Sequence, residues 1–516
     1  MTAPDVDAAG DTTGDTAGDT AGDTAGDTAD AATAAPAALR NGPRHHIDGR
    51  WVAGRGGRTI PVEDPSTATP VAEVARGDAA DVDAAVRAAA DCARRTRAAD
   101  PADRGRALRA LAAGLDAARE ELARLETLDT GKPLSLARSE IAGCVAYLDY
   151  YAGAADKLQG ETIPIGPGSL AYTVCEPVGV TGHIVPWNAP LSMLCRSLAP
   201  ALAAGNTAVV KPAEQTPLTA LRFADLVAGA GYPPGTYNVV TGLGTEAGHA
   251  LAAHPGIGSL TFTGSVATGR SVLRAAAEHV TPVVTELGGK SAQIVFADAD
   301  LDDVADQVVT GFTANSGQYC DAGSRLLVER AAHDELVERI VARTAALTLG
   351  PGIEDPDLGP MVSREHQRRV LGHVETGRRE GAVPAASAQS VPDTGHFVAP
   401  TTFTHVTPRM RIAREEIFGP VLAVLPFDDE AHAVELADAT DYGLGAGIHT
   451  VDIDRALRVA GRVRAGYVMI NEYFGGGVAV PFGGTGLSGT GRERGLVALD
   501  NYVTRKTVVA RVRPLR

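Results

Sequence analysis

Between residues 178 and 287, short runs of apolar residues alternate with longer stretches in which apolar residues recur every three or four positions. The short runs are typical of buried β-strands, and the longer stretches are typical of amphipathic helices. The predicted strands are 180–185, 207–211, 237–240, 259–262 and 283–286, and the predicted helices are 192–204, 218–230, 246–254 and 266–278. This alternation predicts parallel β-α-β units, which bind ligands at the carboxyl ends of their strands.

The sequence on either side of this block predicts further elements. Residues 46–52 predict two short strands joined by an Asp-Gly turn, and helices are predicted over 81–97 and 101–127. A strand over 292–296 and a helix from about residue 301 begin a second α/β block, which extends from about residue 290 to 478. The β-branched residues in 502–512 predict a terminal strand. This strand needs a partner strand, because the unpaired backbone groups of a strand edge pair readily with other chains.

The first 40 residues differ from the rest in composition. A Gly-Asp-Thr-Thr/Ala repeat occurs five times from Gly10 to Ala29, with no aromatic residue. So little apolar surface cannot offset the entropy of ordering, so we expect residues 1–40 to form a disordered acidic tail. The tail holds eight Asp and one Arg, and therefore −7 of the formal net charge of −16. The remaining acidic surface disfavours nucleic acid and anionic membranes as partners.

The overall composition is that of a soluble globular protein, with 516 residues of which 44% are hydrophobic and 21% charged. This length suggests about two to four domains. No apolar run reaches the roughly 20 residues of a membrane span, and no secretory signal is recognisable, so we expect a cytoplasmic protein. The five cysteines are scattered without a C-x-x-C pair, which favours reduced thiols and no metal site.

Candidate chemistry concentrates between residues 286 and 325. Glu286 precedes two glycines, and Cys320 lies among glycines about one strand and one helix later, so the two side chains can converge. A thiol nucleophile with a carboxylate that activates water is, in outline, a covalent acyl-transfer site. A lone cysteine is more often a small buried hydrophobic residue, and spacing alone leaves both interpretations open.

Three other motifs follow predicted strands. Asn188 in PWNAP (186–190) either caps the next helix or directs its amide at a developing oxyanion. Lys211 and Glu214 either bind the ribose hydroxyls of a dinucleotide or form a surface ion pair. The FTGS sequence at 262–265 offers backbone N–H groups to a pyrophosphate, whereas the glycines at 242–248 depart from the spacing of the Rossmann fingerprint.

The order and wording of these motifs resemble the NAD(P)-dependent aldehyde dehydrogenase superfamily over about residues 44–512. The resemblance is carried by PWN (186–188), ELGGK (286–290), GQYC (317–320), EEIFGP (415–420), PFGG (481–484) and GRE (491–493). It implies an α/β fold with a Rossmann-like cofactor-binding domain, an α/β catalytic domain and a β-strand oligomerisation arm. The implied ranges are 44–156 with 177–287 for the NAD-binding domain, 288–490 for the catalytic domain, and 157–176 with 500–512 for the arm.

The resemblance also implies a mechanism. Cys320 would attack the aldehyde carbon, and Asn188 with the backbone N–H of Cys320 would hold the oxyanion. Glu286 would be the general base for hydrolysis of the resulting thioester, and its presence favours release of free acid over transfer to coenzyme A. Glu493 would be a second carboxylate that relays protons. The implied partners are an aldehyde substrate and further copies of the chain, as a homodimer or homotetramer.

The implied cofactor is NAD. Glu214 would hold both adenine-ribose hydroxyls and repel a 2′-phosphate, so NAD is favoured over NADP. Ser265 would contact the pyrophosphate, and Glu416 and Phe418 the nicotinamide ribose. The full set of implied cofactor contacts is Pro186, Trp187, Lys211, Glu214, Gly244, Phe262, Gly264, Ser265, Leu287, Glu416 and Phe418.

The sequence departs from the family along the predicted substrate channel. Positions that often carry aromatic residues are Ala189, Arg196, Ala314 and Gly476, and only Phe482 stays aromatic there. A frequent lysine after PWN is Ser197, the lysine of F-G-G-x-K is absent, and Asp321 follows the nucleophile. These changes predict a wider, more polar channel for a larger or functionalised aldehyde. Arg196 would receive a carboxylate or Asp321 an amine, and the sequence does not choose between them.

Three alternatives to an NAD-dependent hydrolytic aldehyde dehydrogenase come from the same residues. A semialdehyde dehydrogenase would use the same chemistry on a carboxylate-bearing aldehyde. A binding or structural protein on this fold would have lost its nucleophile or base, but Cys320, Glu286 and Asn188 are all present. A thiol hydrolase with a histidine partner would leave the cofactor motifs unexplained. We also expect Asp321 to raise the pKa of the neighbouring thiol by charge repulsion.

Overall fold

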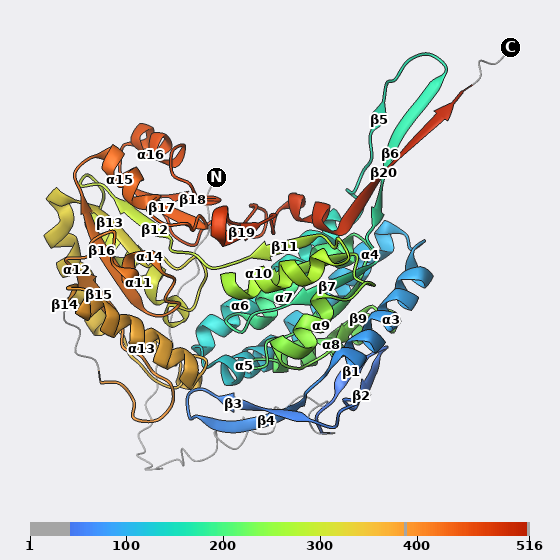
Figure 1. Cartoon of the computed structure of the whole chain (residues 1–516), viewed down its shortest axis with the longest axis horizontal. Helices are drawn as coiled ribbons and strands as arrows, with labels where there is room; N and C mark the ends of the chain where they lie inside the picture. Colours follow the sequence, from blue (N-terminus) through green and yellow to red (C-terminus); the bar gives the residue numbers. More distant parts are fainter. Residues whose placement is uncertain (1–41, 386–389, 513–516) are drawn as a thin grey trace, which may run out of the picture. The chain divides into compact units, whose positions relative to one another are not determined.

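The computed structural model describes residues 42–385 and 390–512, and the predicted acidic tail lies outside that part of the chain. Within these ranges, no helix combines the length and apolar character needed to cross a membrane. Two large sheets, each covered by helices, form the framework of the described chain (Figure 1).

The first sheet contains the predicted β-α-β units. Its strand order is β19-β11-β10-β7-β8-β9-β1-β2. The strands are β7 (Val180–Ile184), β8 (Thr207–Lys211), β9 (Tyr237–Val239), β10 (Ser259–Thr263), β11 (Val283–Glu286), β1 (His45–Ile47), β2 (Arg50–Val52) and β19 (Gly489–Thr490). The strands from β7 to β11 pair in parallel, as predicted. The chain leaves β7 toward β8 and β9 and then returns to β10 on the other side, so a ligand crevice is expected between β7 and β10.

Helices cover both faces of this sheet, because its strands are apolar on both sides. Along β8, Ala208 and Val210 join one apolar core and Val209 joins the other. The first face carries α4 (Pro101–Ala117), α5 (Arg119–Thr130), α6 (Leu134–Ala154), α7 (Pro190–Ala203) and α8 (Leu218–Gly229). The second face carries α3 (Ala79–Thr96), α9 (His249–Ala252) and α10 (Val266–Ala277).

Three features of the helices differ from the prediction. The helix predicted over 101–127 is two helices, because Ala118 leaves helical geometry with φ −96° and ψ 13°. The helix predicted over 246–254 begins with a π-helical turn, Gly244–Gly248, before α9. No helix was predicted over α6, Leu134–Ala154. This helix packs against neighbouring helices on more than one side, so it lacks the single apolar stripe that marks a surface helix.

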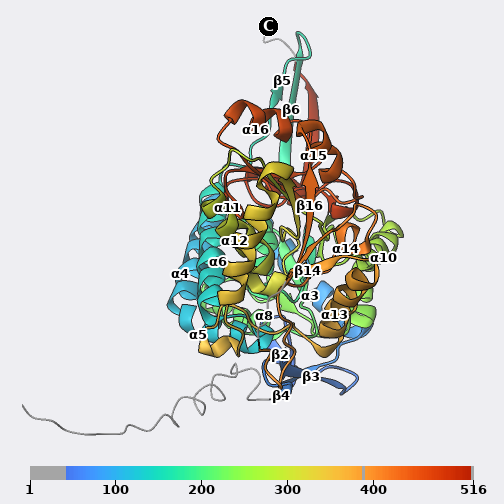
Figure 2. The same cartoon turned by 90° about the vertical axis from the view of Figure 1, so that its left-hand side faces the viewer.

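The second sheet has the strand order β14-β15-β16-β13-β12-β17-β18. Its strands are β12 (Ala292–Val295), β13 (Arg325–Glu329), β14 (Val383–Ala385), β15 (Thr401–Thr404), β16 (Val421–Phe427), β17 (Gly445–His449) and β18 (Tyr467–Ile470). Two helices cover one face, α11 (Leu301–Thr313) and α12 (His333–Ala346). The opposite face carries α13 (Arg364–Arg379), α14 (Arg411–Arg414), α15 (Glu430–Ala437) and α16 (Ile453–Ala460) (Figure 2).

A separate three-stranded sheet holds the predicted terminal strand. β20 (Val503–Arg511) pairs antiparallel with β6 (Ser169–Pro177), which pairs with β5 (Thr162–Ile163) (Figure 1). A two-stranded hairpin, β3 (Thr59–Asp64) with β4 (Thr69–Ala75), completes the described strands. The division into a cofactor-binding domain, a catalytic domain and an arm remains a prediction for these sheets.

Candidate active site

One cavity of about 670 Å³ is lined by the carboxyl ends of β7, β10 and β11, by α6 and α7, and by the loop after α11. The predicted site residues that line it are Pro186, Trp187, Asn188, Ala189, Arg196, Gly264, Ser265, Glu286, Leu287, Ala314, Cys320, Asp321, Glu416, Phe418 and Phe482. Those that do not line it are Lys211, Glu214, Gly244, Phe262, Gly476 and Glu493. The cavity therefore brings together the nucleophile, base and oxyanion residues expected from the sequence.

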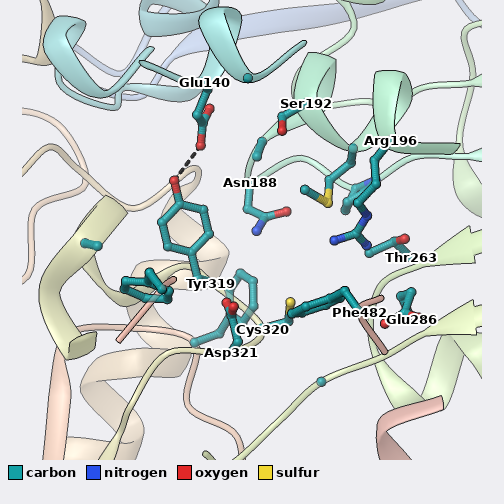
Figure 3. Close-up of a pocket in the computed structure, with 18 of the residues that line it drawn as sticks. Glu140, Asn188, Ser192, Arg196, Thr263, Glu286, Tyr319, Cys320, Asp321 and Phe482 are labelled. Atoms are coloured by element: carbon teal, nitrogen blue, oxygen red, sulfur yellow. Dashed lines mark hydrogen bonds between the residues drawn. The ribbon is translucent and has the colours of Figure 1, made fainter. Parts of the chain in front are cut away.

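Glycines allow Glu286 and Cys320 to converge. Glu286 ends β11, and a Cβ atom at Gly289 would lie 2.4 Å from the carbonyl oxygen of Cys320. A Cβ atom at Gly483 would lie 2.7 Å from a carboxylate oxygen of Glu286. Neither position has room for a side chain, so the ELGGK and PFGG motifs let three backbone segments meet around the site (Figure 3).

The loop before Cys320 is held in an unusual conformation. Asn315 and Ser316 have positive φ angles of 51° and 55°, which non-glycine residues rarely adopt. The Gln318 amide nitrogen donates to the carbonyls of Asn315 and Pro360 at 3.0 and 3.2 Å, and its oxygen accepts from the backbone N–H of Val362 at 3.0 Å. The buried Gln318 side chain therefore fixes the strained turn that presents the nucleophile.

Asn188 does not cap the helix that follows it. The N-cap of α7 is Ala189, with no side-chain capping bond, so the capping interpretation of Asn188 is wrong. Its amide nitrogen donates to the carbonyl of Gln318 at 2.9 Å, which leaves its second N–H for another acceptor. Within the described chain, the backbone N–H of Cys320 makes no hydrogen bond, so both expected oxyanion donors have capacity.

Three buried charged groups lie together at the base of the cavity. Glu286 is 1% exposed, and neither of its oxygens accepts a hydrogen bond from the described residues. Burial raises the pKa of Glu286 well above its ordinary value, Glu493 raises it further, and Arg196 opposes the shift. Arg196 and Glu493 form a buried ion pair. Glu286 thus sits buried next to an opposed pair of charges, and its raised pKa makes its carboxylate a stronger base than an exposed one.

The surroundings of the Cys320 thiol favour its protonated form. Burial raises the pKa of the Cys320 thiol, Asp321 raises it further, and Arg196 opposes the rise. The sequence predicted that Asp321 raises the pKa of this thiol, and the structure gives the same direction. Burial is the larger cause of the rise. A thiol in this state is a poor nucleophile until its surroundings change.

We therefore expect slow alkylation of Cys320 at neutral pH. Because its pKa is raised, the thiolate fraction and the rate with iodoacetamide should increase continuously from pH 7 to about pH 10. Replacing Asp321 with Asn removes one repelling charge and should speed alkylation at neutral pH by roughly tenfold, the effect of one pKa unit. Peptide mass spectrometry against time measures this. Rapid, pH-independent labelling of the unliganded protein would contradict it.

The cofactor end of the site is arranged around Glu416. One of its oxygens accepts from the backbone N–H of Gly289 at 3.1 Å, and burial raises its pKa to about 7. Trp187 meets the edge of Phe418 at a centroid distance of 5.2 Å. Ser265 caps α10 by accepting from the N–H of Thr268, so the start of this helix faces the cavity, as a pyrophosphate site requires.

Lys211 and Glu214 lie beside the cavity at the end of β8. The Lys211 ammonium donates to Glu214 at 2.7 Å. Burial opposes ionisation of Glu214, but Lys211 outweighs it and lowers the Glu214 pKa. An ionised, half-exposed carboxylate at a strand end fits the ribose hydroxyls of a dinucleotide.

Sequence reasoning missed part of the cavity wall. Tyr147, Tyr319, Tyr467, Phe474 and Arg494 line it but were not expected there. The wall is therefore more aromatic than the sequence predicted. One of these aromatic residues, Tyr319, donates a hydrogen bond to Glu140 of α6 at 2.5 Å (Figure 3). Gly476 does not line the cavity, although its neighbours Gly475 and Gly477 do, and a Cβ atom there would lie 2.3 Å from the Tyr467 hydroxyl. The one feature of the sequence that could have pointed to Arg494 as a cavity residue is the charged Gly-Arg-Glu-Arg turn at 491–494.

Comparison with known proteins agrees with this geometry. The aldehyde dehydrogenase family matches residues 51–508. A hydroxyisobutyraldehyde dehydrogenase of Mycolicibacterium austroafricanum is 45% identical over 488 residues, which cover 94% of this chain and 96% of that protein. The NAD⁺ complex of a Bacillus cereus aldehyde dehydrogenase is 42% identical with a TM-score of 0.89, covering 92% of this chain and 98% of that one. Staphylococcus aureus betaine aldehyde dehydrogenase with NAD⁺ is 36% identical with a TM-score of 0.90, covering 93% and 97%.

Proposed function

The chain belongs to the aldehyde dehydrogenase family, and on that premise we propose that it oxidises an aldehyde to the carboxylic acid with NAD through a thioester on Cys320. The observation that carries the proposal is the convergence of Cys320, Asn188 and Glu286 on one cavity. A binding or structural role is disfavoured because nucleophile, oxyanion donor and base are all retained there.

The first half of the reaction uses the Cys320 loop. The Cys320 thiol releases its proton to solvent water, and its sulfur attacks the aldehyde carbon, giving a thiohemiacetal whose oxygen takes the carbonyl electron pair and is negative. The free N–H of Asn188 and the backbone N–H of Cys320 donate to that oxygen, where each donor removed typically costs about 10²- to 10³-fold in rate. When bound, NAD supplies the hydride acceptor that turns this adduct into a thioester.

The second half uses Glu286. Its carboxylate takes a proton from water, the water oxygen attacks the thioester carbon, and the Cys320 thiolate leaves. Its raised pKa makes it basic enough for this step once it is ionised. Of the two members of the nearby Arg196–Glu493 ion pair, Glu493 raises the pKa of Glu286 and Arg196 partly offsets that rise.

The substrate on this proposal is a larger or functionalised aldehyde. The charged residues Arg196, Asp321 and Arg494 line the cavity together with aromatic side chains. Oxidation of a hydroxylated aldehyde, the activity named for the 45%-identical Mycolicibacterium protein, is compatible with such a wall. The three-stranded sheet leaves the outer edge of β20 unpaired and Val509 65% exposed, which supports a homodimer or homotetramer joined through this arm.

The proposal is tested by absorbance of the reduced cofactor, with NAD or NADP and a panel of aliphatic, aromatic, hydroxylated, amino and carboxylate-bearing aldehydes. We expect turnover with NAD and one equivalent of carboxylic acid for each NADH formed. Turnover in which acid appears without NADH, or no turnover by protein that binds NAD, would refute it.

Cofactor choice is expected to depend on Glu214. Replacing Glu214 with Ala removes the acceptor of the ribose hydroxyls and the charge that repels a 2′-phosphate. We expect the ratio of kcat/KM for NAD over NADP to fall by about tenfold or more, since hydrogen bonds to charged groups are worth about 1.5–3 kcal/mol. Glu335→Ala, an exposed carboxylate on α12, is the control. An unchanged ratio in the Glu214 variant would assign cofactor choice to other residues.

A further inference from the structure

The cavity wall carries charged side chains of both signs, and the positive charge of Arg196 is already neutralised by an ion pair. The Arg196 guanidinium forms an ion pair with Glu493, and both side chains are almost fully buried. A carboxylate on the substrate would have to compete with Glu493 for this cation. The structure therefore argues against Arg196 as a free receptor for an anionic substrate.

Asp321 and Arg494 are differently placed. Both line the cavity, and within the described chain neither forms an ion pair. Both adjoin one aromatic cluster, in which Tyr473 and Phe482 take part: Tyr473 bonds to Asp321, and Arg494 lies over Phe482. Burial raises the pKa of Asp321 and Arg494 opposes the rise, while the Tyr467 pKa, also raised by burial, is lowered by Arg494 and raised by Asp321. The two side chains thus present an unpaired anion and an unpaired cation in one region of the wall.

Both residues are fixed in position. The Tyr473 hydroxyl donates to the backbone carbonyl of Asp321 at 2.8 Å. Phe482 and Glu493 exchange two backbone hydrogen bonds of 2.7 and 2.8 Å, which anchor the turn that carries Arg494. The Arg494 guanidinium carbon lies 4.6 Å from the centroid of the Phe482 ring.

The backbone at Arg494 supports a ligand-binding role. Its φ is +59°, a conformation that non-glycine residues seldom adopt without cause. A glycine would be the unstrained choice there, so an arginine at this position carries a conformational cost. This cost is explained if the side chain binds something that enters the cavity.

The opposite charges of Asp321 and Arg494 indicate which chemical group the ligand carries. A carboxylate would be attracted by Arg494 and repelled by Asp321, and an ammonium group would meet the reverse. A neutral hydroxyl satisfies both, because it donates to the Asp321 carboxylate and accepts from the Arg494 guanidinium.

We propose that Asp321 and Arg494 form a subsite for the hydroxyl group of a neutral hydroxylated aldehyde. Because Asp321 directly follows the nucleophile, this hydroxyl lies on a carbon near the carbonyl, as in 2-hydroxy and 3-hydroxy aldehydes. The inference rests on the proposed aldehyde oxidation and names its substrate class.

The test compares aldehydes that differ by one group. Steady-state kcat/KM is measured with NAD for 2-hydroxypropanal and 3-hydroxypropanal against propanal, and for a carboxylate-bearing and an ammonium-bearing analogue. We expect the better hydroxylated aldehyde to exceed propanal by about tenfold or more, the range for hydrogen bonds to charged groups. Both charged analogues should fall below it.

Variants then assign this preference to the two residues. Arg494→Gly removes the guanidinium and relieves the positive φ, so it should fold, and Asp321→Ala removes the carboxylate. Each should reduce the hydroxyl-to-propanal ratio by about tenfold, while Arg330→Met, an exposed arginine paired with Asp428, should leave the ratio unchanged.

The outcomes separate the subsite from the reaction. Turnover of propanal with no hydroxyl preference, a preference for either charged analogue, or a ratio unaltered by both variants would overturn the subsite and leave the proposed oxidation standing. No turnover with any aldehyde would overturn both.

Discussion

Replacing Cys320 with alanine is expected to abolish aldehyde oxidation while NAD still binds. Among the described residues, Cys320 carries the one thiol that lines the cavity with Asn188 and Glu286, so no thiohemiacetal or thioester can form without it. Loss of a covalent nucleophile typically lowers kcat by about 10⁴- to 10⁶-fold. NADH formation measures the loss, and calorimetric titration with NAD shows whether the cofactor site survives.

A matched control separates this effect from loss of any thiol. Cys175 lies on β6 in the three-stranded sheet and is partly exposed. Cys175→Ala should retain the rate of the natural sequence because this thiol does not line the cavity. Appreciable oxidation by the Cys320 variant would mean that another group carries the chemistry.

Replacing Glu286 with glutamine is expected to preserve the initial burst of NADH and to abolish most of the steady-state turnover. Attack by Cys320 and formation of the first NADH do not require this carboxylate as a base. Hydrolysis does, and loss of a general base typically costs about 10²- to 10⁴-fold. Stopped-flow absorbance should show one NADH per active site, followed by very slow turnover.

The pH dependence provides a second readout for Glu286. Its pKa is raised by burial, so the carboxyl is protonated and inactive as a base at low pH. Hydrolysis by the natural enzyme should therefore increase as the pH rises through that raised pKa, and the glutamine variant should lose this dependence. Glu335→Gln on the exposed surface of α12 serves as the control. A variant with normal turnover, or with no burst, would show that Glu286 has a different role.

The sequence predicted the parallel sheet because its strands are short, continuous apolar runs separated by amphipathic helices. It pointed to Cys320 and Glu286 through motifs whose glycines have a local steric cause, and to Asn188 through the glycine-free PWN motif. At Gly289 and Gly483 that cause is visible, since a side chain would collide with the Cys320 backbone or the Glu286 carboxylate.

The part of the cavity wall that would face the substrate was harder to predict, because it depends on contacts between side chains far apart in the sequence. Arg196 was expected to face the substrate, but its ion pair with Glu493, almost 300 positions away, carries no local signal. Tyr147 lies on α6, whose contacts on more than one side hide the usual helical pattern. Tyr319 was visible in the sequence, yet its bond to Glu140 depends on packing between α6 and the nucleophile loop.

The most direct test of the central claim is to trap the thioester. Glu286→Gln protein would be mixed with NAD and aldehyde, quenched in acid, digested and analysed by mass spectrometry. The account predicts that the peptide containing Cys320 gains the mass of the acyl group, and only when NAD is present. An unmodified Cys320 during turnover, or an acyl group on another residue, would contradict it.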